Sequence, residues 1–177
     1  ETYVEPTLES IEADIEALEN EPPIDVGSSA WEVHRHIVEK MKGTHFIAAL
    51  GGGLEFPKFG CTVEDAWINL LEKPEVCMKL QEFRLKKSLQ LINAYADLGM
   101  DGIIPCGDLG NSAGLSAHPD LYKDMVYPAQ KVQSDEAKRR EIKILLHCCG
   151  HTWPVVDYIA ELYDAYEAIQ MSAGMDL

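Results

Sequence analysis

The sequence has few cationic residues for its size and no long hydrophobic segment. Its 15 Lys and Arg residues stand against 30 Asp and Glu, so the formal net charge is −15. Such an acidic surface argues against nucleic acid and anionic membranes as partners, because both repel negative charge. No apolar run reaches the ~18 residues of a transmembrane helix, and the first residues lack the pattern of a signal peptide. From these absences we expect a soluble, cytoplasmic protein.

Three further signatures are missing. The five cysteines include one adjacent pair and follow no regular spacing, which differs from a disulfide framework and favours a reducing compartment. No serine, histidine and aspartate occur in a recognisable catalytic order. The glycines at 51–53 are not a G-x-G-x-x-G fingerprint, because no acidic residue follows at the dinucleotide spacing. A flexible loop is the simplest interpretation, and the alternative is that Gly52 lets backbone amides approach an anion.

The hydrophobic pattern predicts one globular domain in which strands and helices alternate. With 177 residues, 46% of them hydrophobic, the chain is long enough for a core of its own. Residues 1–44 are expected to form a helical lead-in segment before the domain proper at 45–177. Strands are predicted over 45–50, 101–106, 142–148 and 165–169. Helices are predicted over 8–18, 28–41, 62–71, 74–98 and around 155–162, with another that starts at Pro119 and kinks or ends at Pro128.

This alternation implies a parallel sheet with helical crossovers. Two architectures fit it: an open doubly wound sheet and a (β/α)8 barrel of the TIM type. In both, functional groups collect at the carboxyl ends of the strands. Those ends carry Gly51-Gly52-Gly53, Cys106-Gly107-Asp108, His147-Cys148-Cys149 and Gln170-Met171.

The segment His147-Cys148-Cys149 is the strongest chemical signal. Side chains alternate between the faces of a strand, so His147 and Cys149 share one face while Cys148 points into the core. An imidazole and a thiol at this spacing suit a zinc site or an activated thiol. The alternative is a hydrogen-bonded core histidine beside small buried cysteines. His151, just beyond, is expected to be an exposed loop residue.

Other cysteines and one aspartate lie near this segment or on the helices. Cys106 and Asp108 share a face by the same alternation. Asp108 has three candidate roles: it binds substrate, orients His147 as a supporting carboxylate, or caps a turn. Cys106 is expected to pack in the core, and Cys61 and Cys77 are expected to be structural.

An ordered series of motifs resembles the uroporphyrinogen decarboxylase superfamily. The series runs from Asp101-Gly102 through Cys106-Gly107-Asp108, Gly114-Leu115, His118-Pro119-Asp120-Leu121-Tyr122 and Tyr127-Pro128 to Leu146-His147-Cys148-Cys149-Gly150. The resemblance implies a (β/α)8 barrel, of which this chain covers roughly the middle half. One branch of the superfamily decarboxylates tetrapyrroles without a metal or cofactor. The other resembles methyltransferases that use a methyl-corrinoid protein.

The resemblance favours the methyltransferase branch, whose members carry a His-x-Cys zinc pair and a third ligand, usually Cys, much later. His147 and Cys149 match that pair, which decarboxylases typically lack, and the third ligand is expected beyond Leu177. The implied function is methyl transfer between a methyl-corrinoid (cobalamin) protein and a thiol such as coenzyme M. Asp108 and His147 are then catalytic, and Gly52, Asp108 and Gln170 are expected near the corrin or substrate.

Two alternatives remain at this stage. Tetrapyrrole decarboxylation predicts a protein without metal that tolerates changes at His147. A truncated, non-catalytic homologue predicts an obligate oligomer, with itself or another subunit, because half a barrel leaves strand edges open.

Overall fold

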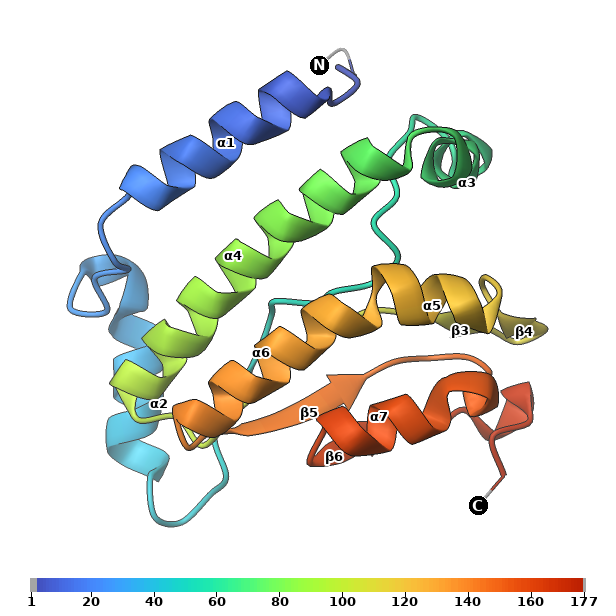
Figure 1. Cartoon of the computed structure of the whole chain (residues 1–177). Coiled ribbons are helices and arrows are strands. Elements are labelled where there is room, and N and C mark those ends of the chain that lie inside the picture. The colour runs from blue at the N-terminus through green and yellow to red at the C-terminus, as the bar shows by residue number, and fades with distance from the viewer. Residues whose placement is uncertain (1–2, 177) are drawn as a thin grey trace.

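The computed structural model describes residues 3–176 and contains a parallel sheet covered by helices (Figure 1). The strands are β1 (Ala48–Leu50), β2 (Gly102–Ile104), β5 (Lys143–His147) and β6 (Ala165–Glu167). They lie in the order β1-β2-β5-β6, and every neighbouring pair is parallel. A separate antiparallel hairpin joins β3 (Gly110–Asn111) to β4 (Gly114–Leu115).

Residues 3–176 contain seven α-helices. They are α1 (Leu8–Asn20), α2 (Glu32–Met41), α3 (Val63–Glu72), α4 (Pro74–Leu98), α5 (Pro119–Met125), α6 (Tyr127–Arg139) and α7 (Val156–Leu162). Single 3₁₀ turns occupy Ser29–Trp31, Trp153–Val155 and Met171–Ala173. None of the helices within residues 3–176 has the length and apolar character needed to cross a membrane.

The strand order decides between the two predicted architectures. Strands follow one another across the sheet in chain order, and α4, α6 and α7 cover the same face (Figure 1). A doubly wound sheet reverses its strand order at a switch point, whereas a (β/α)8 barrel adds each strand beside the last. The α/β fold of the TIM-barrel type is therefore confirmed, with four parallel strands that follow one another in chain order.

Burial follows the alternation of β5. Ile144, Leu146 and Cys148 face the helices and are buried, while Lys143 and His147 on the other face are not. The period-2 pattern of the sequence thus predicted correctly which side of this strand enters the core.

Helix α4 is the longest element and begins and ends where the sequence predicts. Pro74 is its first residue, and Gly99 follows it with a left-handed φ of 80°, a conformation that glycine adopts without strain. Its buried side chains recur at a spacing of three and four residues and include Cys77, Gln81 and Ser88. On its outer side α1 packs alongside it (Figure 1).

Three local predictions need correction, and one element was missed. The β3–β4 hairpin was not predicted, because its strands have two residues each. Helix α5 ends at Met125, before Pro128, and Pro128 is instead the second residue of α6. In the first turn of a helix the backbone N–H has no partner within the helix, so proline is tolerated there. Cys61 and Cys106 were expected to be structural or packed but are exposed. Cys106 points to the sheet face that the helices leave uncovered.

Candidate metal centre

Three neighbouring strand ends bring ligand-type side chains together at the carboxyl edge of the sheet. His147 is the last residue of β5, and in the sheet register it lies opposite Glu167, the last residue of β6. From the β2 side, Cys106 forms a parallel bridge with His147, and Asp108 follows two residues later. Parallel strands end at the same edge, which places these groups around one point.

The central cluster consists of Asp108, His147 and Cys149. One ligand atom from each lies within 4.8 Å of the other two. The Nε2 atom of His147 is 3.9 Å from the Sγ atom of Cys149. Asp108 is exposed and the other two are half-buried. The structure thus places His147 and Cys149 on one face as the sequence predicts, with a carboxylate beside them.

Hydrogen bonds to the surrounding residues fix the orientation of this cluster. The Nδ1 atom of His147 shares a hydrogen bond with Oε1 of Glu167, which leaves Nε2 facing the thiol. The backbone N–H of Cys149 donates to Oδ1 of Asp108 at 2.8 Å. The next N–H, of Gly150, donates to Oε1 of Gln170 at 3.0 Å. Side chains from other strand ends thus hold the ring of His147 and the backbone at Cys149 and Gly150.

Glu167 was not among the predicted site residues. The role of a carboxylate that orients His147 was one of three predicted for Asp108. The carboxylate that supports His147 belongs to Glu167, whereas the hydrogen bond that Asp108 accepts comes from Cys149. The available signal was an acidic residue inside the last predicted strand. Its alignment with His147 depends on strand register, which the sequence does not reveal.

The adjacent thiols differ in environment. Cys148 is fully buried and accepts the N–H of Leu109 at 3.3 Å, and burial raises its pKa to about 11. The pKa of Cys149 is also raised, first by desolvation and then by the carboxylates of Asp108 and Glu167. Neither thiol has the cationic surroundings that activate a free cysteine nucleophile. The surroundings therefore do not stabilise a free thiolate at Cys149.

Gly52 has contacts of a different kind. Its carbonyl accepts hydrogen bonds from Ser88 Oγ at 3.1 Å and from Gln133 Nε2. A Cβ atom at this position would lie 2.6 Å from Ser88 Oγ, and the φ of 70° is left-handed. Tight packing against α4 and α6 thus explains this glycine.

The loop after β1 is held by three buried glutamines, which we call the glutamine clamp. Gln133 donates to the carbonyl of Gly52, Gln130 to Leu54 at 2.8 Å and Gln81 to Glu55 at 3.2 Å. This loop was predicted to be flexible, but these hydrogen bonds hold it in place at the carboxyl edge of the sheet.

His151 lies just outside the cluster. Its ring nitrogen Nδ1 contacts the carbonyl of Ala173 at 2.9 Å, and the side chain is half-buried rather than exposed. Its hydrogen bond ties the loop after β5 to the 3₁₀ turn at Met171–Ala173.

A comparison with curated proteins gave no match. The family model described as Uroporphyrinogen decarboxylase (URO-D) matches residues 2–177. The matched range includes all four strands of the parallel sheet and the cluster at its carboxyl edge. The chain therefore belongs to the uroporphyrinogen decarboxylase family.

Proposed function

We propose that this chain acts as a zinc-dependent methyltransferase, which moves a methyl group between a methyl-corrinoid (cobalamin) protein and a thiol-type acceptor such as coenzyme M. The observation that carries the proposal is the pairing of His147 Nε2 with Cys149 Sγ at 3.9 Å, while Glu167 occupies the other ring nitrogen. A histidine whose second nitrogen is held by a carboxylate is a recurrent arrangement in zinc sites.

The donor atoms fit the ion. Zinc in catalytic sites takes imidazole, thiolate and carboxylate donors. Its bonds to nitrogen and sulfur, about 2.0 and 2.3 Å long, add up to more than the 3.9 Å between Nε2 and Sγ. One ion can therefore contact both atoms.

Each residue then has a defined task. His147 and Cys149 hold the ion, and Glu167 keeps His147 in the tautomer that presents Nε2. When bound, zinc supplies a Lewis acid that lowers the pKa of an acceptor thiol into the neutral range. In the net transfer the acceptor thiol would release its proton to solvent, its sulfur would form a bond to the methyl carbon, and the carbon–cobalt bond would break with its electron pair left on cobalt.

Access to the cluster supports a second protein as methyl donor. Asp108 is exposed, and His147 and Cys149 are half-buried at the edge of the sheet. A corrinoid carried by another protein needs such an open site, because donor and acceptor must come within bonding distance.

The test is zinc per chain, measured by elemental analysis on protein purified without chelator. We expect about one zinc per chain in the wild type, retention in His36→Ala, where the histidine is exposed on α2, and loss in His147→Ala. Methyl transfer from a methylated corrinoid protein to coenzyme M should follow the same order. A wild-type protein without zinc would contradict the proposal and favour metal-free decarboxylation or a non-catalytic subunit.

A further inference from the structure

We propose that Asp108 is the third protein ligand of this metal centre, so that Asp108, His147 and Cys149 form a three-donor set with a fourth position left for the acceptor thiol. The inference rests on the proposed function, because it concerns the same ion. It differs from the family pattern named above, in which the third ligand is a later cysteine.

The position of Asp108 supports direct ligation. Its carboxylate is the only third group among residues 3–176 that comes within 4.8 Å of both the His147 and Cys149 ligand atoms. The N–H of Cys149 binds one oxygen, Oδ1, at 2.8 Å. This bond fixes the carboxylate beside the thiol and engages only one of its two oxygens.

The structural roles that an aspartate commonly has are either filled by another residue or absent at Asp108. Support of His147 is provided by Glu167. No lysine or arginine among the described residues forms an ion pair with Asp108, and none does so with Glu167, whose one such partner is His147. Asp108 is also not the N-cap residue of any helix in residues 3–176. Asp108 therefore has no compensating lysine or arginine among the described residues, and the hydrogen bond that it accepts comes from the N–H of Cys149.

The donor set points the same way. The carboxyl groups of Asp108 and Glu167 and the thiol of Cys149 lie beside the His147 imidazole, and no lysine or arginine among the described residues pairs with either carboxyl group. A bound divalent cation is often the largest local charge in a site of this kind. The set of one nitrogen, one sulfur and one oxygen donor matches catalytic zinc centres, which keep one coordination position open.

Cys106 is the rival third ligand. It is exposed, follows β2 by two residues and, through its parallel bridge with His147, faces the same side of the sheet. Its Sγ atom contacts the carbonyl of Ile104 at 3.6 Å, and it does not belong to the cluster of mutually close ligand atoms. The two candidates differ in donor element, which makes them separable by spectroscopy.

The first measurement needs no variant. X-ray absorption at the zinc edge of the wild-type protein counts the sulfur donors. One sulfur with nitrogen or oxygen donors is expected from Asp108, His147 and Cys149, whereas two sulfurs would overturn the assignment in favour of a second cysteine, either Cys106 or the later cysteine of the family pattern.

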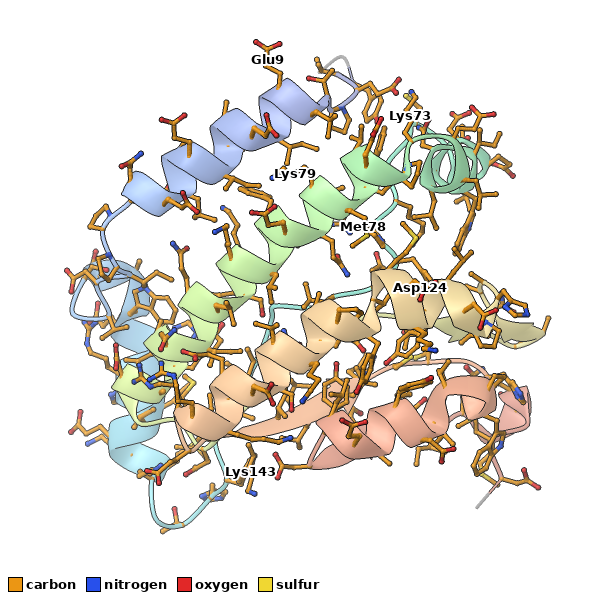
Figure 2. The ribbon with its side chains drawn as sticks, in the orientation of Figure 1. Glu9, Lys73, Met78, Lys79, Asp124 and Lys143 are labelled. Carbon is orange, nitrogen blue, oxygen red and sulfur yellow. The ribbon has the colours of Figure 1, made fainter. Side chains whose placement is uncertain are left out.

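The second measurement is a Co²⁺ titration of the wild type and three variants, followed by visible absorption. Asp108→Asn should weaken binding by more than the ~100-fold that loss of a supporting residue produces, with the thiolate-to-cobalt charge-transfer band retained. Cys106→Ser and Asp124→Asn should bind as the wild type does; Asp124 lies exposed on α5 (Figure 2). Circular dichroism of the metal-free variants checks that each is folded.

The outcomes separate this inference from the proposed function. If the wild type binds neither Zn²⁺ nor Co²⁺, the proposed function fails. If the wild type binds both ions and a folded Asp108→Asn binds equally well, only the ligand role of Asp108 is wrong.

Discussion

At the amino edge of the sheet, Asp101 and Asp164 each bind a lysine and a backbone N–H, whereas at the carboxyl edge Asp108 and Glu167 contact the residues that offer ligand atoms. Asp101 contacts Lys42 Nζ at 2.5 Å and the N–H of Ile47 at 2.9 Å. At the carboxyl edge, Asp108 has no lysine within ion-pair distance among residues 3–176. The same side-chain type therefore serves two purposes at opposite ends of one sheet.

The arrangement at the amino edge is repeated. Asp164, just before β6, contacts Lys143 Nζ at 2.7 Å and the N–H of Ile144 at 3.0 Å; Lys143 is labelled at this edge in Figure 2. In both cases the aspartate precedes one strand and accepts an N–H at or just before the start of the neighbouring strand. These carboxylates join neighbouring strands, so their contribution is to stability, in keeping with the division between the two faces of (β/α)8 barrels.

The largest expected effect is loss of metal in Cys149→Ser. Zinc affinity should fall by at least ~100-fold, because a thiolate ligand is removed. The free energy of unfolding of the metal-free protein should change by only about 0.5 kcal/mol, since the side chain is not in the core. Zinc titration and urea unfolding measure the two quantities.

Cys148→Ser is the matched control for that experiment. Its hydroxyl replaces a thiol in the core, so unfolding should cost about 1–3 kcal/mol less, while zinc binding is retained. If zinc were lost in Cys148→Ser and kept in Cys149→Ser, the assignment of the two faces of β5 would be wrong.

The next effect is expected in Glu167→Gln. Without the carboxylate, His147 Nδ1 loses its charged partner, and zinc affinity should fall about 10- to 100-fold. The unfolding free energy of the metal-free protein should stay nearly constant because Glu167 is exposed. Unchanged affinity in isothermal titration would show that Glu167 does not support the ligand.

A smaller effect, confined to stability, is expected at the amino edge. Asp164→Asn removes the ion pair with Lys143 and weakens the bond to Ile144, at a cost of about 1 kcal/mol in unfolding free energy. Zinc affinity should be unchanged. A coupled loss of zinc affinity would show that the two edges are not independent.

The smallest effect is the pH dependence of Asp101. Its pKa is lowered, first by the hydrogen bond from Lys42 and then by that from the Ile47 N–H. A lowered folded-state pKa stabilises the protein above the unfolded value of about 3.9, and this stabilisation is lost as the pH falls through the folded value.

Urea unfolding of the metal-free protein tests this contribution. The difference in unfolding free energy between the wild type and Asp101→Asn should be constant from pH 7 to pH 5 and shrink below about pH 4. A difference that stays constant down to pH 3 would contradict the role assigned to this carboxylate.

Local features of the sequence predicted much of the fold and part of the site. Pro74 and Gly99 bound α4 as expected, and strand alternation placed His147 and Cys149 together and Cys148 in the core. These signals act within a few residues of chain, where backbone sterics and side-chain periodicity decide the outcome.

The features that escaped prediction depend on contacts between distant segments. Glu167 meets His147 through the register of two strands that are 20 residues apart. Cys106 is exposed because the helices cover only the other face of its strand. Gln130 and Gln133 have ordinary helical surroundings in sequence, and only the tertiary structure shows that both are buried against the loop after β1.

The glutamine clamp holds the loop after β1 with uncharged groups, whereas the amino edge of the sheet is held by ion pairs. The two regions should therefore respond differently to changes in pH and salt concentration. Amide side chains carry no net charge and do not titrate, and salt screens them little because they are buried. Gly52, Leu54 and Glu55 should therefore keep their positions across a range of acidity and ionic strength. A change in metal binding with pH can then be attributed to the ligands themselves rather than to movement of the loop after β1.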